Sequence, residues 1–226
     1  MAEKEGWKAR RDASREILYS ETATTKDYVD YYNTWAPHYD QDKVDSEALS
    51  WDLAMENLLK YETNKDALIL DFCGGTGVVG ARLAKLGYTN LEIHDGSAGM
   101  LEKAKEKGVF RRTYCELVER DRPLAFLEEN VANGHTYDYI NINGAPCEFK
   151  VPVEHMLMQA LKPGGHLSIA QSVDNVARLG LDGIQWAEEE AKRPDAAFEL
   201  LEKTTDKIIF GKEKTKAYIV VFRRKP

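Results

Sequence analysis

Residues 67–87 read ALILDFCGGTGVVGARLAKLG, and this stretch decides the fold. The apolar run ALILDF (67–72) is typical of a buried strand. VVGARLAKLG (78–87) has the apolar spacing of a helix and ends at a glycine, as helices often do. A glycine-rich turn, CGGTG (73–77), joins the two. A strand that passes through glycines into a helix is the first unit of a doubly wound sheet.

The alternation of strand and helix continues along the chain. We expect strands at 91–95, 110–115, 137–142 and 166–171, and helices at 97–108, near 123–130 and at 152–161. FELLEKTTDKIIFG and KAYIVVFRR, joined by a turn around Gly211, read as an antiparallel pair. We therefore predict an α/β fold with a Rossmann-like doubly wound sheet, mostly parallel with an antiparallel C-terminal strand.

The region before this sheet is expected to be helical. After a charged, mobile start, one helix is predicted from Thr24 or Thr25 to a point before Pro37, because proline ends helices. A second is predicted from Ser46, a serine suited to an N-cap. The chain then reads as one domain, 1–226, with 1–60 as an N-terminal helical cap and 61–226 as the cofactor-binding sheet.

The glycine loop fits two kinds of cofactor. Gly75, Gly77 and Gly80 satisfy GxGxxG, and Asp95 ends the next strand, where a carboxylate can accept both ribose hydroxyls. Dinucleotide and S-adenosylmethionine binders share these features. Asp71, at the end of the first strand, would repel a pyrophosphate but attract an ammonium and a sulfonium. It therefore favours S-adenosylmethionine over a nicotinamide cofactor.

Three motifs carry a resemblance to a known family. ILDFCGGTG (69–77) resembles motif I of class I S-adenosylmethionine-dependent methyltransferases, HDGSAGMLEKA (94–104) resembles their second motif, and LKPGG (161–165) matches the turn before their fifth strand. With YYNTWAPHYDQD (31–42) in front, the chain looks most like the methyltransferase-like proteins of the Williams–Beuren syndrome chromosomal region. The chain departs from motif I at Cys73, which stands in place of its first glycine.

The resemblance implies a set of cofactor-binding residues. The loop around the methionine moiety would comprise Asp71, Cys73, Gly74, Gly75 and Gly77. The ribose would be held by Asp95, and the adenine would lie near Gly96, Met100, Cys115 and Glu116. Ligands of open α/β sheets lie beyond the carboxyl ends of the strands, so Asn141 and Asn143 should border both cofactor and acceptor.

The aromatic segment, YYNTWAPHYD (31–40), permits two interpretations. As a lid, it would turn Tyr32, Trp35 and Tyr39 toward the cofactor, where ring faces attract a sulfonium. It would then place His38 at the entrance for the acceptor. As a staple, the same rings would fasten the N-terminal helix to the core. His155 is a further candidate for orienting the acceptor.

Composition narrows the partners and the location. A net charge of −7 over 226 residues disfavours nucleic acid, whose phosphates need concentrated Lys and Arg. No apolar run is long enough to span a bilayer, and MAEKEGWKARR lacks the apolar segment of a signal peptide. Three distant cysteines suit free thiols in the cytoplasm. No cluster suggests a metal, and the oligomeric state is not predicted.

The predicted function is methyl transfer from S-adenosylmethionine to a small-molecule O, S or N acceptor. NINGAPCEF (141–149) lacks the [D/N]PP[Y/F] tetrad of amino-methyltransferases, which disfavours nucleobase and glutamine amide acceptors. The alternatives are a non-catalytic S-adenosylmethionine-binding sensor or scaffold and, more distantly, a dehydrogenase.

Overall fold

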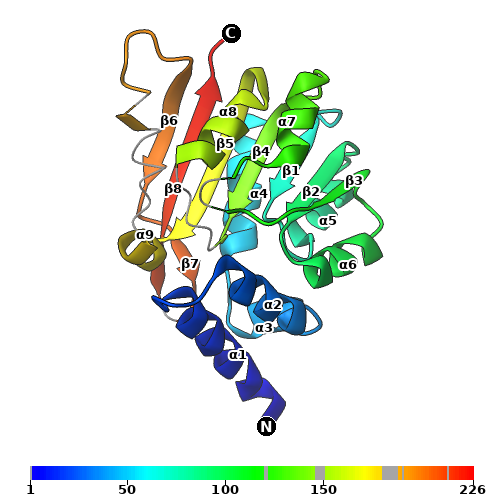
Figure 1. Ribbon diagram of the computed structural model, residues 1–226, viewed down its shortest axis with the longest axis vertical. Coiled ribbons are helices and arrows are strands. Elements are labelled where there is room, and N and C mark those ends of the chain that lie inside the picture. The colour runs from blue at the N-terminus through cyan, green and yellow to red at the C-terminus, as the bar shows by residue number, and fades with distance from the viewer. Residues whose placement is uncertain (1, 120–121, 146–150, 180–187, 190, 213) are drawn as a thin grey trace.

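The computed structural model describes residues 2–119, 122–145, 151–179, 188–189, 191–212 and 214–226 (Figure 1). Its centre is one sheet with the strand order β3-β2-β1-β4-β5-β8-β6, and β7 pairs with β8. The first five strands are parallel, while β6, β7 and β8 pair antiparallel. The predicted fold class is confirmed. The strands are β1 (Ile69–Phe72), β2 (Leu91–Asp95), β3 (Arg112–Cys115), β4 (Tyr137–Asn143), β5 (Leu161–Ser172), β6 (Phe198–Thr204), β7 (Ile208–Phe210) and β8 (Thr215–Arg224).

Helices cover both faces of the sheet and one of its ends. In Figure 1, α1, α2 and α3 gather at the end of the sheet toward which β1 and β4 run. One face packs against α4, α5 and α6, and the other against α7 and α8. The described helices are α1 (Ala2–Leu18), α2 (Thr25–Trp35), α3 (Tyr39–Asp45), α4 (Ser50–Tyr61), α5 (Val78–Lys85), α6 (Ala98–Glu106), α7 (Ala125–Ala132), α8 (Val151–Gln159) and α9 (Val173–Leu179).

Alternating side chains of the central strands supply the two halves of the core. Every residue of β1 is buried. Ile69 packs with α4 and α5, whereas Leu70 and Phe72 pack with α7 and α8. This division follows from the period of two along a strand. With both faces covered, polar side chains at the strand ends are left as the groups that can meet a ligand.

The N-terminal region differs from the prediction in two places. The charged start is helix α1, held by two hydrogen bonds from Arg10 to Asp42, each 2.6 Å, and by one from the Tyr31 hydroxyl to the Arg10 carbonyl. Ser46 does not begin a helix; it is the C-cap of α3, and α4 begins at Ser50. The helix predicted from Thr24 is confirmed, because Thr24 and Asp27 form a capping box at the start of α2.

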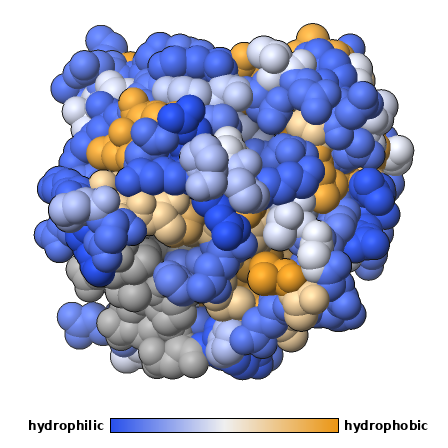
Figure 2. Space-filling model, turned by 90° about the horizontal axis from the view of Figure 1, so that it is seen from above, coloured by the Kyte–Doolittle hydropathy of each residue, from blue (hydrophilic) through white to orange (hydrophobic). Residues whose placement is uncertain are grey.

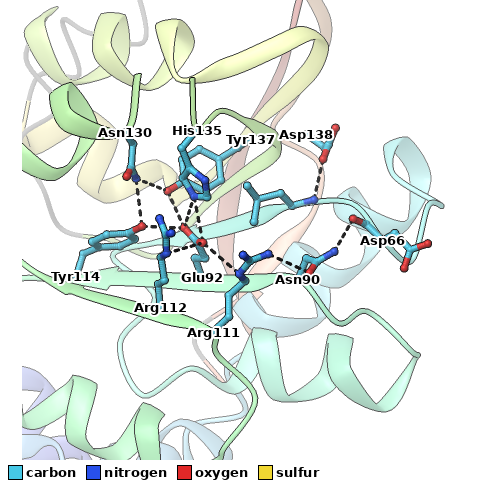
Figure 3. A network of polar contacts seen from close by, with 11 residues as sticks. Asp66, Asn90, Glu92, Arg111, Arg112, Tyr114, Asn130, His135, Tyr137 and Asp138 are labelled. Atoms are coloured by element: carbon cyan, nitrogen blue, oxygen red, sulfur yellow. Dashed lines mark hydrogen bonds and ion pairs between the residues drawn. The ribbon is translucent and has the colours of Figure 1, made fainter. Parts of the chain in front are cut away.

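One network of buried polar groups joins four elements away from the strand ends (Figure 3). Glu92, on β2, is fully buried. The hydroxyls of Tyr114 and Tyr137 donate to its carboxylate at 2.9 and 3.0 Å, and His135 Nε2 lies 3.0 Å away. Asn130, on α7, donates to both tyrosine oxygens. The carboxylate therefore ties β2 to β3, β4 and the segment after α7.

Figure 2 presents the outer surface of one side of the molecule. Hydrophobic residues there form small groups separated by hydrophilic ones. Among the helices of the described ranges, none combines the length and the apolar character needed to cross a membrane.

Candidate active site

A cavity of about 430 Å³ lies between the glycine loop and the N-terminal helices. Asp71, Asp95 and Asn143 reach it from the carboxyl ends of β1, β2 and β4, and Tyr32 and Tyr39 reach it from α2 and α3. Small-molecule sites commonly measure about 300–1,000 Å³. The cavity is therefore of the size and in the place expected for the ligand of an open α/β sheet.

The glycine loop has a backbone that only part of its sequence favours. Gly75 and Gly77 have φ angles of 59° and 75°, where glycine is unstrained, but Cys73 also has a positive φ, 54°. Gly75 faces the cavity, whereas a Cβ on Gly77 would lie 2.5 Å from the ring of Phe110. Gly75 thus gives a ligand access to backbone, and Gly77 allows α5 to pack closely.

Asp71 is a buried acid with unused bonding capacity. Its side chain lines the cavity and is only 4% exposed. Asn141 Nδ2 donates to Oδ1 at 2.8 Å, while Oδ2 has no hydrogen-bond partner. Burial, with the charge of Asp95 adding to it, raises the pKa of Asp71 to about 7, although the bond from Asn141 opposes the shift. An unpartnered buried carboxylate oxygen is costly, so this site is suited to a cation.

Asp95 is held by backbone amides at the end of β2. Ser97 N donates to Oδ1 and Gly75 N to Oδ2, both at 2.8 Å. Burial raises the pKa of Asp95 to about 6, while these amides and that of Gly96 oppose the shift. Each carboxylate oxygen can accept a second bond. Asp95 can therefore accept hydroxyl groups from a ligand while fixing the loop.

The aromatic segment is divided between the two predicted roles. Tyr32 and Tyr39 line the cavity, and burial raises the pKa of Tyr39 well above its ordinary value. Trp35 is 4% exposed and is not among the residues lining the cavity; its Nε1 donates to Asp42 at 2.6 Å. The two tyrosines are placed as a lid, whereas Trp35 is placed as a staple.

A side-chain cap fastens α2 to α6. Asn33 Oδ1 accepts hydrogen bonds from Ser97 Oγ at 2.7 Å and from Gly99 N at 2.9 Å. A Cβ on Gly99 would lie 3.0 Å from the Asn33 carbonyl oxygen, so the two helices are in close contact. The cover of the cavity is thus attached to the helix that follows Asp95.

The remaining predicted cofactor residues are spread between the cavity and the core. Cys73, Gly74, Gly96 and Asn143 line the cavity. Met100 is fully buried in the core and does not line it. Asn141, also buried, reaches the cavity only through Asp71.

Cys115 ends β3 and Glu116 follows it, but neither lines the cavity. Cys115 is exposed, and its Sγ lies 4.0 Å from the Gly96 carbonyl oxygen. The Glu116 carboxylate accepts bonds from Ala125 N and Phe126 N. It therefore caps the start of α7, where a carboxylate stabilises unpaired amides.

The two histidines predicted to serve the acceptor do not line the cavity. His38 is exposed and lies at the N-cap position of α3. His155 is exposed on α8, where its ring contacts Gln159. Neither placement supports a role in catalysis.

Sequence reasoning missed several residues of the cavity. These are Thr24, Lys43, Ser50, Trp51, Leu117 and Ala145. The position of Lys43 could have been inferred, because it lies one helical turn after Tyr39 and therefore on the same face. In the described ranges, no group of acidic, histidine and cysteine side chains could hold a metal ion.

The comparisons with known proteins agree with this site. No protein-family model matches the chain. A segment of 139 residues is 34% identical to methyltransferase-like protein 27 of Homo sapiens, covering 60% of this chain and 54% of that protein. The chain thus spans about half the length of this curated relative.

Solved structures share the fold at low identity. A TehB-like SAM-dependent methyltransferase from Corynebacterium glutamicum aligns with a TM-score of 0.55 and 18% identity, over 85% of this chain and 99% of that one. A putative methyltransferase from Haloferax volcanii, solved with the Trm112 activator, aligns with a TM-score of 0.56 and 17% identity, over 86% and 96%. The fold is that of class I S-adenosylmethionine-dependent methyltransferases, and the comparisons support this enzyme class and its cofactor.

The cavity itself fits S-adenosylmethionine. The unpartnered Oδ2 of Asp71 suits the ammonium group, and Asp95 suits ribose hydroxyls. Gly75 leaves room for a ligand beside the loop, since only Tyr39 comes within 4 Å of its Cβ position, at 3.9 Å. Two acids at adjacent strand ends in one cavity would repel the pyrophosphate of a dinucleotide.

Proposed function

We propose that this chain transfers a methyl group from S-adenosylmethionine to a small-molecule O, S or N acceptor. The observation that carries the proposal is the pair of carboxylates, buried Asp71 and half-buried Asp95, in one cavity beside the glycine loop. A ligand with a cation and vicinal hydroxyls would satisfy both acids. We also propose that the chain is most similar to the methyltransferase-like proteins of the Williams–Beuren syndrome chromosomal region and that it is located in the cytoplasm.

The chemistry requires alignment more than proton transfer. The bound cofactor supplies an electrophilic methyl group on a sulfonium, which the lone pair of the acceptor displaces in line. The residues of this chain would hold the ammonium at Asp71 and the ribose at Asp95, while Tyr32 and Tyr39 exclude water. An acceptor that reacts as a thiolate has no proton to lose, and an amine acceptor would release its proton to solvent after the transfer, so neither needs a base in the cavity.

A small acceptor is supported by the cover over the cavity. Helices α2 and α3 close it with tyrosines, and the ties of Asn33 to Ser97 and Gly99 hold the cover against α6. The fold alone does not set the size of the acceptor, because a ribosomal protein L11 methylase from Lactobacillus delbrueckii shares it, with a TM-score of 0.52 and 15% identity over 78% of this chain and 79% of that one.

Ligand binding tests the proposal first. S-adenosylhomocysteine and S-adenosylmethionine should raise the melting temperature, because a ligand at a hundredfold excess over its Kd adds about 2.7 kcal/mol to the free energy of unfolding. NAD should leave it unchanged. Protein free of copurified ligand whose melting temperature does not respond to millimolar S-adenosylhomocysteine would overturn the proposal.

A non-catalytic S-adenosylmethionine sensor is the second candidate. It is favoured by one observation: among the described residues, neither predicted histidine lines the cavity. Incubation with labelled S-adenosylmethionine and a cell extract separates the two candidates. An enzyme yields S-adenosylhomocysteine and a labelled product in proportion to its amount, whereas a sensor yields neither.

A further inference from the structure

A second, smaller cavity of about 60 Å³ adjoins the main one on the side away from the glycine loop. Lys43, Tyr28, Tyr32, Leu18 and Gly144 line both, so the two share a wall. Water occupies about 30 Å³ per molecule in the liquid, so the space suits a small polar group rather than a second large ligand.

Lys43 is the charged side chain in that shared wall. Its Nζ lies 5.0 Å from the ring centre of Tyr39 and 5.3 Å from that of Phe210. Within the described ranges it makes no hydrogen bond or ion pair. Burial lowers the pKa of Lys43 to about 8, with Arg15 and Arg11 adding to the shift, which still leaves most of it protonated at pH 7. A cation held only by ring faces retains its capacity to bind an anion.

The surroundings of Lys43 are positively charged, although the whole chain carries −7. Arg11 and Arg15 line the smaller cavity with it. The acid there, Asp42, is already occupied by two bonds from Arg10 and one from Trp35, each 2.6 Å. Arg11 also contacts Asp12 at 2.9 Å. Among the described residues that line the smaller cavity, Lys43, Arg11 and Arg15 are cationic and Asp42 is acidic, and Asp42 is already bonded to Arg10.

The wall shared with the main cavity suits the rest of an acceptor, which the larger space would hold. Tyr28 and Tyr32 line both cavities and offer ring faces beside Lys43. Rings next to cations are typical of sites for an apolar or aromatic body with a charged end.

The carboxylate of the cofactor is a less suitable partner for Lys43. Tyr39 contacts both the loop and the lysine: its Cε1 is 3.9 Å from the Cβ position of Gly75, and its ring centre is 5.0 Å from Lys43 Nζ. The charges that act on Lys43 are those of Arg15 and Arg11 rather than Asp71 or Asp95. Lys43 therefore faces the side from which an acceptor would come.

We propose that the methyl acceptor carries an anionic oxygen group, a carboxylate or a phosphate, which Lys43 and Arg15 bind. This inference rests on the proposed function, since it assigns the substrate class of the same site.

The test uses three probes on one aromatic body: benzoate, phenyl phosphate and the neutral benzyl alcohol. Each is titrated into the full chain saturated with S-adenosylhomocysteine, and binding is measured by calorimetry and by melting temperature. We expect one anion or both to bind, which identifies the preferred group, and benzyl alcohol not to bind. Lys43→Met should lower the affinity for the anion at least tenfold and change the affinity for S-adenosylhomocysteine less than twofold.

Lys65→Met is the matched control. Lys65 Nζ lies 3.8 Å from the ring centre of Tyr88, outside both cavities, so this variant also loses a lysine over a ring and should bind the anion normally. Should Lys43→Met fail to fold, Arg15→Met is measured in the same way.

The inference is overturned if neither anion binds the wild-type complex. It is also overturned if Lys43→Met lowers the affinity for S-adenosylhomocysteine tenfold or more, because Lys43 would then bind the cofactor. Wild type that binds no S-adenosylhomocysteine at all would instead refute the proposed function.

Discussion

Two carboxylates, buried Glu92 and half-buried Asp95, lie three residues apart on β2 and have opposite surroundings. Glu92 accepts from two tyrosine hydroxyls and contacts His135, with Arg111 and Arg112 at 3.7 and 3.8 Å. Asp95 shares its cavity with Asp71, whose Oδ2 has no partner. The first acid is completed by the fold. At the strand ends, Asp71 has an oxygen without a partner, and Asp95 keeps room for further bonds beside its two backbone amides. This difference separates a structural site from one that can hold a ligand.

The largest expected effect concerns stability. Glu92→Ala leaves the hydroxyls of Tyr114 and Tyr137 without their acceptor and should lower the free energy of unfolding by about 3–5 kcal/mol. Urea denaturation measures this change. The affinity of the folded protein for S-adenosylhomocysteine should remain within twofold of wild type. A loss below about 1 kcal/mol would mean that the Glu92 network is not structural.

Asp71→Asn should give the reverse pattern. Removal of a charge-assisted bond costs about 1.5–3 kcal/mol of binding, or about tenfold to a hundredfold in the Kd for S-adenosylhomocysteine. Stability without ligand should not fall, because the variant no longer buries a charge. Calorimetry and urea denaturation of one preparation test both. Wild-type affinity in the variant would remove Asp71 from the site.

The acid pair also predicts a pH dependence. Burial raises the pKa of Asp71 to about 7 and that of Asp95 to about 6, so both become neutral as the pH falls. Affinity for S-adenosylhomocysteine should therefore fall from pH 8 to pH 5.5, by about tenfold per unit below the pKa. Calorimetry across this range measures it, and a flat profile in wild type would contradict the assignment.

The same shifts act on the ligand-free protein in the opposite direction. A raised carboxyl pKa means that the folded state binds protons more tightly than the unfolded state. The free energy of unfolding should therefore decrease as the pH rises from about 4 through the folded pKa values. Asp71→Asn is the control, since it should weaken this dependence as well as the dependence of affinity.

The smallest expected effect on affinity comes from the aromatic segment. Tyr39→Phe removes one hydroxyl at the cavity and should weaken the binding of S-adenosylmethionine by about 0.5–1.5 kcal/mol, with the free energy of unfolding unchanged. Trp35→Leu should lower stability by about 1–3 kcal/mol and leave affinity unchanged, since Trp35 packs away from the cavity. If both variants lost only affinity, the division between lid and staple would be wrong.

Strands and loops that depend on local sequence were predicted well. β2 has the predicted bounds, and Ser97 caps α6. These features follow from contiguous apolar residues and from capping side chains, which act within a few positions. The acids at the strand ends were predictable for the same reason.

Features that depend on distant contacts were missed. α1 is rich in charged residues. It is held in place by hydrogen bonds from the Arg10 side chain to Asp42 and from the Tyr31 hydroxyl to the Arg10 carbonyl. Glu116 follows a strand as expected, but its carboxylate caps α7, nine residues further along the chain. The spacing of Lys43 from Tyr39 puts both on one face of α3, but that this face covers the cavity depends on how α3 packs over the sheet. Side-chain direction after a strand is decided by packing that the local pattern does not contain.

The attachment of Asn33 has a consequence for kinetics. Its oxygen accepts from both Ser97 and Gly99, so α2 cannot swing away unless the first turn of α6 loses those bonds. Release of S-adenosylhomocysteine from beneath the two tyrosines would therefore require fraying of the first turn of α6. The dissociation rate of S-adenosylhomocysteine is then limited by the rate at which the N-terminus of α6 opens. Hydrogen–deuterium exchange of the Gly99 amide reports this opening directly.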